Sequence, residues 1–283
     1  MRRRAILLAA VTGILAVGAA WARARQATVP EGVAFEPDIT YATAGGEALR
    51  LDLARPQSGD GPFPLVVCIH GGGWQAGSKA DFRTAAFGLA QQGFAAASVQ
   101  YRLAPRHPFP AQYDDVKAAV AALRERAKEW KIDPDRVAVL GGSAGGHLAL
   151  MLATDPALKI KAAVSLAGPT DLTRSFPEET DRIVRTLIGP DAPDPAEARR
   201  LASPIRRVGP GVAPILMIHG DQDEIVPYDQ STTMRDAYRG AGLDAELLTI
   251  RGGKHGGGGS AEDGASAILK AVEFLRSHLK AGP

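Results

Sequence analysis

The chain has 283 residues, of which 45% are apolar and 23% are charged, and it contains a single cysteine. This composition is that of an ordinary folded domain, and a chain this apolar buries a core, which excludes disorder as the main state. The lone Cys68 excludes an internal disulfide and any cysteine-based zinc or iron–sulfur site. Only one long apolar run occurs, which excludes a polytopic membrane protein.

The formal net charge of +2 depends on the first 24 residues. Three arginines precede an apolar run from Ala5 to Ala20, and small residues then offer the A-x-A cleavage pattern. Residues 1–24 are therefore predicted to be a signal peptide, with a retained N-terminal anchor as the alternative. Arg3-Arg4 leaves Sec and twin-arginine export both open.

Without residues 1–24, 29 of the 33 basic side chains remain against 31 acidic ones. The basic character therefore belongs to the predicted signal. We expect a periplasmic or secreted protein with no nucleic-acid partner and no stable membrane association after signal removal.

A short polar linker, 25–36, is expected before one domain at 37–283. Strand patterns lie near 38–43, 48–53, 64–70, 94–101, 136–141, 161–168, 213–219 and 245–250. Helical patterns lie near 82–92, 111–130, 143–154, 228–240 and 263–280. Two strands followed by strand–helix alternation predict an α/β fold, with a mostly parallel eight-stranded sheet and helices on both faces.

The stretch 171–210 interrupts this alternation and is rich in proline and arginine. It is long for a connection between two elements, so we expect it to carry helices near 178–188 and 194–203. We interpret it as a small cap insertion over the sheet.

The segment Gly141 to Gly145 has the pattern G-x-S-x-G, directly after a strand and at the start of a helix. A serine at such a turn has its hydroxyl raised above the sheet, and its backbone tolerates only small neighbours. The helix that follows directs its positive end at a developing oxyanion. Ser143 is therefore a candidate nucleophile.

A second glycine-rich loop, Gly71 to Gly73, follows another buried strand. Consecutive glycines allow several backbone N–H groups to converge on one point, where they can hold a negatively charged oxygen. Ligands of open α/β sheets bind at the edge where both loops lie. The two loops together predict an acyl-transfer site.

A nucleophilic serine needs a base, which in this fold type follows the acid along the chain. The six histidines are His70, His107, His147, His219, His255 and His278. The first four precede the expected acid, and His278 lies near the end of an amphipathic helix. His255, in a loop after a strand, remains as the candidate base.

The acid is expected in the loop after the preceding strand, where Asp221, Asp223 and Glu224 stand close together. Asp223 is favoured, followed by Asp221 and then Glu224, although spacing alone does not separate them. Asp171, after the strand at 161–168, is an outside candidate.

Two aromatic side chains near these motifs are candidates for substrate binding. Trp74 is expected either to line the acyl pocket or to pack its loop. His147, one helical turn after Ser143, is expected to line the floor of the site or, as the favoured alternative, to pack. No metalloprotease, P-loop or dinucleotide motif occurs, so neither a metal nor another cofactor is expected.

Taken together, these motifs resemble those of the α/β-hydrolase superfamily. More narrowly, they are similar to the esterases related to hormone-sensitive lipase and to the bifunctional acetylxylan/feruloyl esterases. The resemblance covers most of residues 37–280. It is carried by His70-Gly-Gly-Gly-Trp74 with Gly77-Ser-Lys79, Tyr101-Arg-Leu-Ala-Pro105, Phe109-Pro-Ala111 with Asp115, Ile132-Asp-Pro-Asp-Arg136, Gly142-Ser-Ala-Gly-Gly-His147, Ala202-Ser-Pro204, His219 to Pro227, and His255.

The resemblance implies that Ser143 is the nucleophile, Asp223 the acid and His255 the base. It also implies an oxyanion hole made by the amides of Gly72, Gly73 and Ala144. The sequence departs from the family pattern at two places. At the first, Gly142 replaces the aspartate usual in the lipase-like branch, which favours the carbohydrate-esterase-like branch. Four glycines follow His255, where the family often has an aromatic.

We therefore expect an exported serine esterase acting on small-molecule or oligosaccharide esters of small acyl groups, acetyl or feruloyl among them. An amidase or peptidase of the prolyl-oligopeptidase or formamidase kind is the enzymatic alternative. A non-catalytic binding module on the same fold is the alternative from another class.

Overall fold

The computed structural model describes residues 28–256 and 260–280, so the expected signal peptide at 1–24 lies outside the described residues. The linker expected at 25–36 is too long, because strand β1 (Val33–Ala44) begins within it. Val33 is buried, and the Phe35 ring packs edge-on against Phe87 at a centroid distance of 5.0 Å. The domain therefore starts at Val33 rather than at residue 37, because these apolar side chains cover the core.

Eight strands form one sheet in the order β1-β2-β4-β3-β5-β6-β7-β8. Strand β2 pairs antiparallel with β1 and β4, and all other neighbours are parallel. The mostly parallel eight-stranded α/β fold expected from the sequence is confirmed. After β1, the strands are β2 (Glu47–Pro56), β3 (Phe63–Ile69), β4 (Ala95–Val99), β5 (Ile132–Gly142), β6 (Ala162–Leu166), β7 (Ile215–Gly220) and β8 (Ala245–Ile250).

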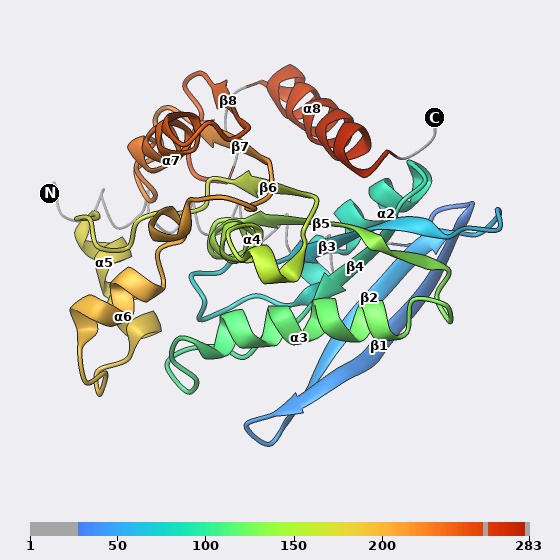
Figure 1. The fold of residues 1–283 in the computed structure, drawn as a ribbon, viewed down its shortest axis with the longest axis horizontal. Helices are drawn as coiled ribbons and strands as arrows, with labels where there is room; N and C mark the ends of the chain where they lie inside the picture. Colours follow the sequence, from blue (N-terminus) through green and yellow to red (C-terminus); the bar gives the residue numbers. More distant parts are fainter. Residues whose placement is uncertain (1–27, 257–259, 281–283) are drawn as a thin grey trace, which may run out of the picture.

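Helices cover both faces of this sheet (Figure 1). One face carries α3, α4 and α7, and the other carries α2 and α8. The α-helices are α2 (Arg83–Gln91), α3 (Ala111–Glu125), α4 (Ala144–Ala153), α5 (Glu178–Ile188), α6 (Pro195–Leu201), α7 (Asp229–Gly240) and α8 (Ala261–Leu279). None of the helices in the described ranges has the length and apolar character that crossing a bilayer requires.

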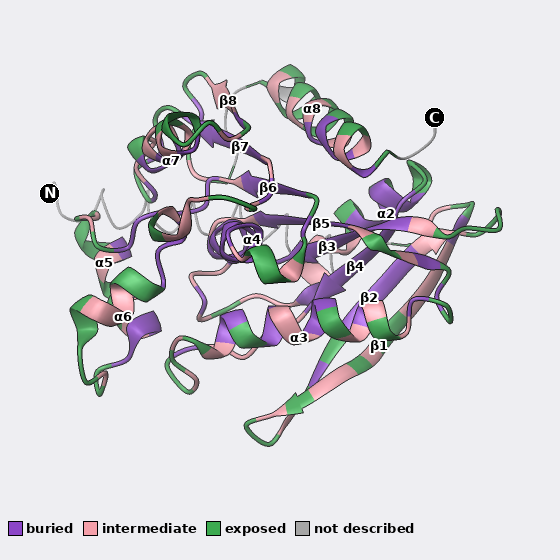
Figure 2. Ribbon diagram, viewed as in Figure 1, coloured by how far each residue is buried: buried purple, intermediate pink, exposed green. Residues whose placement is uncertain are grey.

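Strand β3 shows why the central strands have almost no polar residues. Leu65, Val67 and Ile69 enter the core under α3 and α4, whereas Val66 and Cys68 enter the core under α2 and α8. All five are fully buried, as the continuous burial of the central strands in Figure 2 illustrates. Burial raises the pKa of the Cys68 thiol to about 12, so this thiol is protonated and inert.

The segment between β6 and β7 contains α5, α6 and a short 3-10 turn (Pro204–Arg207), which agrees with the helices expected there. Two hydrogen bonds attach α5 to the sheet edge. The Thr180 hydroxyl donates to the carbonyl of Ile225 at 2.8 Å, and the Gln75 amide donates to the carbonyl of Ile183 at 3.4 Å. The insertion thus lies against the loops that follow β3 and β7.

Candidate active site

Four of the parallel strands, β3, β5, β7 and β8, end at the same edge of the sheet. The glycine loop at 71–73 follows β3, Ser143 follows β5, Asp223 follows β7 and His255 follows β8. Because carboxyl ends of parallel strands share an edge, Ser143 and His255 meet there although they are 112 positions apart in the chain.

Ser143 occupies a sharp turn between β5 and α4. Its φ of 53° and ψ of −120° are strained for a residue with a side chain. Packing holds this conformation: a Cβ on Gly145 would lie 2.0 Å from the carbonyl oxygen of Ile69, and one on Gly141 would lie 2.2 Å from that of Gly145. The turn therefore requires glycine at both positions, which explains the G-x-S-x-G pattern.

The structure brings Ser143, His255 and Asp223 into one chain of hydrogen bonds. The Ser143 Oγ lies 2.9 Å from His255 Nε2, and His255 Nδ1 lies 2.7 Å from Asp223 Oδ2. The Asp223 side chain has no exposed surface, and that of His255 is 17% exposed. A hydroxyl, an imidazole and a buried carboxylate in this order can activate the hydroxyl as a nucleophile.

The alternative acids lie elsewhere. The Asp221 carboxylate is exposed and accepts the backbone N–H of Gly252 at 2.7 Å, so it holds a turn. Asp171 accepts hydrogen bonds from Thr173 and Arg206, and Glu224 is exposed. Of the four carboxylates weighed from the sequence, only Asp223 contacts His255 in the described structure.

The Asp223 carboxylate is ionised at neutral pH. Burial alone would raise its pKa. Hydrogen bonds from His219 and His255, the charge of His255 and the backbone N–H of Val226 outweigh burial and hold the pKa well below its usual range.

The glycine loop after β3 packs directly on the nucleophile turn. A Cβ on Gly71 would lie 2.9 Å from the carbonyl oxygen of Gly142. Gly72 and Gly73 have φ angles of 104° and 60°, in the region that favours glycine. In the part of the chain that the structure describes, the N–H groups of Gly72, Gly73 and Ala144 donate to no backbone carbonyl. These amides are therefore available to a substrate oxygen.

Trp74 and His147 pack against each other, which was one of the two alternatives for Trp74 and the favoured one for His147. Trp74 is 3% exposed and His147 is fully buried. The Trp74 indole N–H donates to His147 Nδ1 at 3.3 Å, and His147 Nε2–H donates to the carbonyl of Ala202 at 2.7 Å. Burial lowers the pKa of His147 to about 4, so the ring is neutral. It joins α4 to the glycine loop and to the end of α6.

Sequence reasoning overlooked His219, which lies on the other side of Asp223. Its Nε2 is 3.1 Å from Asp223 Oδ2, and the side chain is fully buried. His219 was set aside because it precedes the acid along the chain. Its position at the end of β7, four residues before Asp223, was the feature of the sequence that could have indicated a contact with Asp223.

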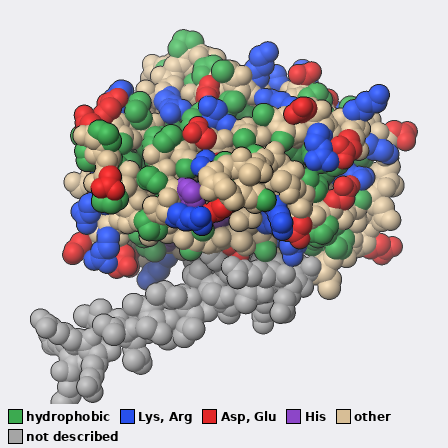
Figure 3. Space-filling model, turned by 90° about the horizontal axis from the view of Figure 1, so that it is seen from below, with side chains coloured by type: hydrophobic (Ala, Val, Ile, Leu, Met, Phe, Trp, Pro, Cys, Tyr) green, Lys and Arg blue, Asp and Glu red, His purple; other side chains and the backbone are tan. Residues whose placement is uncertain are grey.

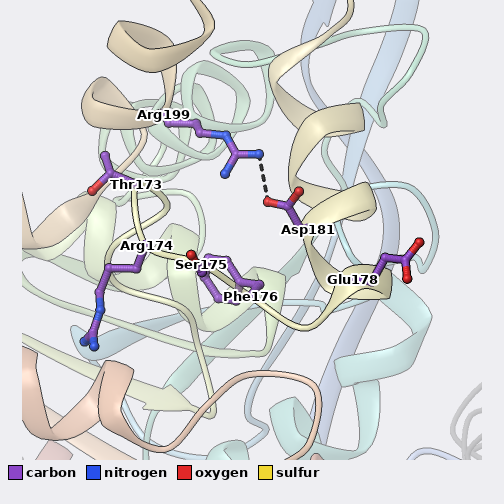
Figure 4. A pocket seen from close by; sticks show the side chains of 7 residues that line it. All are labelled: Thr173, Arg174, Ser175, Phe176, Glu178, Asp181 and Arg199. Atoms are coloured by element: carbon purple, nitrogen blue, oxygen red, sulfur yellow. Dashed lines mark hydrogen bonds and ion pairs between the residues drawn. The ribbon is translucent and has the colours of Figure 1, made fainter.

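A cavity of about 350 Å³ opens in the insertion between the segment at 173–176, α5 and α6 (Figure 4). Its lining combines the ring of Phe176 with polar side chains such as Arg174. Across it, Arg199 pairs with Asp181 at 2.9 Å. None of the lining residues belongs to the Ser143–His255–Asp223 group, but α5, which lines the cavity, also meets the glycine loop: a Cβ on Gly73 would lie 3.0 Å from Ile183.

Comparisons with known proteins show the family to which the chain belongs. The BD-FAE family model matches residues 51–238. Esterase LipC of Mycobacterium tuberculosis is 33% identical over 214 residues, which are 69% of this chain and 53% of LipC. The chain thus spans about half the length of that relative.

Two further similarities cover most of both proteins. Ethyl acetate hydrolase of Pseudomonas putida is 30% identical over 283 residues, covering 88% of this chain and 86% of the hydrolase. A truncated carbohydrate esterase from gut microbiota superposes with a TM-score of 0.77 at 26% identity, over 87% of this chain and 96% of the esterase. The chain therefore belongs to the BD-FAE family of esterases within the α/β-hydrolases.

Proposed function

We propose that this protein is a serine esterase that hydrolyses carboxylic esters of small acyl groups, with Ser143 as nucleophile, His255 as base and Asp223 as acid. One observation carries the proposal: Ser143 Oγ lies 2.9 Å from His255 Nε2 beside amides that donate to no backbone carbonyl among the described residues. Membership of an esterase family supports the same reaction type.

In the first half of the reaction, the Ser143 hydroxyl attacks the acyl carbonyl carbon while His255 Nε2 takes its proton. The carbonyl oxygen becomes negative and receives hydrogen bonds from the amides of Gly73 and Ala144, with Gly72 beside them. Each such donor lowers the barrier by about 3 kcal/mol. The protonated His255, stabilised by Asp223, then gives its proton to the departing alcohol.

In the second half, His255 is neutral again and removes a proton from a water molecule, which attacks the Ser143 ester. The same amides hold the second oxyanion, and the ester bond to Ser143 breaks to release the carboxylic acid. The proton on His255 returns to the Ser143 hydroxyl, so the protein ends the cycle unchanged.

We propose an acetyl or similarly short acyl group on a carbohydrate alcohol, with feruloyl esters as the larger alternative. Ethyl acetate hydrolase as a relative supports the short acyl group. The similarity to a carbohydrate esterase supports the carbohydrate alcohol. The cavity in the insertion adds an aromatic face, Phe176, next to the charged side chains of Arg174 and Asp181, a combination suited to sugar rings and hydroxyls.

The catalytic assignment is tested with p-nitrophenyl acetate, butyrate and longer esters. Ser143→Ala is expected to lower kcat by at least about 10⁴-fold while the protein stays folded, because the nucleophile is lost. Turnover by the alanine variant at the wild-type rate would refute the assignment. An aminoacyl anilide in the same panel tests the amidase alternative, and it should remain uncleaved.

The alcohol specificity is tested with acetylated xylan oligosaccharides. Phe176→Ala is expected to raise KM for these substrates and to leave p-nitrophenyl acetate hydrolysis unchanged, since the small ester has no sugar ring to pack against Phe176. Arg182→Ala, on the exposed surface of α5, is the matched control. Equal kinetics of the Phe176 variant and wild type on both substrates would remove the carbohydrate proposal.

We also propose that the protein is exported and does not bind nucleic acid. The support is the signal pattern at 1–24 and, on the face in Figure 3, the mixing of basic and acidic side chains. N-terminal sequencing of the protein recovered from cell fractions tests export. A mature chain that still begins at Met1 in the cytoplasm would contradict it.

A further inference from the structure

The Asp223 carboxylate has a second imidazole partner. His219 Nε2 lies 3.1 Å from Asp223 Oδ2, which is the oxygen that also faces His255 Nδ1 at 2.7 Å. The two imidazoles come from different loops, after β7 and after β8, and converge on one oxygen atom. The His219 and Asp223 side chains have no exposed surface.

The neighbours of His219 define which ring nitrogen carries the proton. Nε2 faces two acceptors, Asp223 Oδ2 and the carbonyl of Val226 at 3.0 Å, so Nε2 must be the protonated nitrogen. Nδ1 lies 2.7 Å from the Ser231 hydroxyl, which can donate to it. A neutral ring with its proton on Nε2 therefore satisfies every contact.

With this tautomer, the lone pairs of the Asp223 carboxylate are filled. Oδ1 accepts the backbone N–H groups of Ile225 and Val226, each at 2.9 Å. Oδ2 accepts from His219 and from His255. A carboxylate offers about four acceptor positions, and four donors occupy them here.

We propose that His219 is a positioning residue, which holds the Asp223 carboxylate in place and shares Oδ2 with His255. Sharing moderates the hydrogen bond that Asp223 makes to His255, because each donor withdraws electron density from the same oxygen. His219 touches neither the substrate position nor Ser143 and acts through Asp223 alone. The kinetic part of this inference rests on the proposed function, whereas the structural part does not.

Tyr228 packs on the His219 ring and helps to orient it. The Tyr228 ring packs edge-on against it at a centroid distance of 5.7 Å, and the Tyr228 hydroxyl bonds to Thr249 on β8. Asp223, Tyr228 and His255 are the titratable groups that contact His219 or its carboxylate partner among the described residues.

The test compares His219→Phe, which keeps the ring shape without a donor, with His219→Gln, whose amide can still donate near the Nε2 position. Removing one hydrogen bond to a charged acceptor is expected to lower kcat/KM by about 10- to 100-fold in the Phe variant. The acid limb of its pH profile should move to higher pH, because Asp223 then stabilises protonated His255 more strongly. The Gln variant should recover most of both properties.

A readout without substrate separates this inference from the proposed function. The NMR titration midpoint of the His255 Cε1 proton, assigned by its loss in His255→Asn, should rise by about one pH unit in His219→Phe. It should stay close to wild type in His219→Gln. Loss of ester hydrolysis in Ser143→Ala tests the function, and this midpoint tests the role of His219.

Three outcomes would overturn the inference. The first is a Phe variant with the kinetics and midpoint of wild type. The second is an equal loss of activity in the Phe and Gln variants with an unchanged acid limb, which marks a purely structural role. The third concerns the wild type and needs no variant to fold: nitrogen-15 NMR must find the His219 proton on Nε2, and a proton on Nδ1 instead would refute the arrangement.

Discussion

The two halves of the active site are both closely packed, but they differ in the side-chain hydrogen bonds that join their loops. In the nucleophile half, the turns after β3 and β5 touch backbone to backbone, and a Cβ on Gly145 would lie 2.0 Å from Ile69 O. In the base half, the turns after β7 and β8 also touch, since a Cβ on Gly220 would lie 2.2 Å from Gly253 O, but the tip at Gly252 is open, with nothing within 4 Å of an added Cβ. Close backbone packing therefore fixes both halves, and the base half adds side-chain hydrogen bonds between its loops through Asp221 and Asp223.

The largest effect is expected for Gly145→Ala. The added methyl group collides with the backbone oxygens of Ile69 and His70 at 2.0 and 2.5 Å, which cannot rotate away. We expect the free energy of unfolding to fall by at least about 3 kcal/mol, together with loss of ester hydrolysis. Urea unfolding measures the change in unfolding free energy. Gly264→Ala, where the methyl meets nothing within 4 Å in α8, is the control and should stabilise slightly.

A smaller effect is expected for His147→Phe, in which a ring of similar shape leaves the Ala202 carbonyl and the Trp74 indole N–H without partners. Two buried groups that lose their hydrogen bonds should cost about 2 kcal/mol or more of unfolding free energy. An unfolding free energy equal to that of wild type would show that the tie between the glycine loop and α4 is dispensable.

The same variant changes how stability depends on pH. Burial lowers the pKa of both His70 and His147 to about 4, whereas an unfolded histidine titrates near about 6.5. Between these values the unfolded chain binds more protons, so the unfolding free energy falls as the pH decreases from about 6.5 to about 4. Each histidine contributes about 1.4 kcal/mol per pH unit. Denaturant unfolding at several pH values should give a correspondingly shallower slope for His147→Phe.

In the base half, a methyl group added at the open tip of the loop after β8 should have a mild effect. Gly252 has a φ of 66°, so Gly252→Ala should cost about 1 kcal/mol from backbone strain, without a collision. Its kcat should match that of wild type. If this variant proved as damaging as Gly145→Ala, the tip of this loop would be as closely packed as the nucleophile turn.

The smallest effect is expected for Asp221→Asn, since the exposed side chain keeps an oxygen for the Gly252 N–H. Stability should change by no more than about 0.5 kcal/mol, with unchanged kcat. The matched Asp223→Asn should lower kcat by about 10⁴-fold. A reversal of these two results in p-nitrophenyl acetate assays would assign the acid to Asp221.

Periodic and local features were predictable from sequence. Apolar runs such as 64–70 mark buried strands because both faces of β3 are covered, and α5 occupies the range expected for it, 178–188. The start of β1 was missed because its burial pattern is mixed, so alternation was weak before residue 38. Packing was the favoured alternative for His147, but its partners, the Trp74 indole and the Ala202 carbonyl, could not be predicted, since the spacing from Ser143 does not show what covers the helix.

By itself, the sequence determined the sheet, the order of its elements and the strained turn at Ser143, because hydrophobic period and glycine spacing act over a few neighbouring residues. Only the tertiary structure decided which carboxylate meets His255. It also decided that His219 shares the Asp223 oxygen with His255. Those choices depend on where two loops from different strands come to lie, and ångström differences in that placement leave no mark on the spacing of residues along the chain.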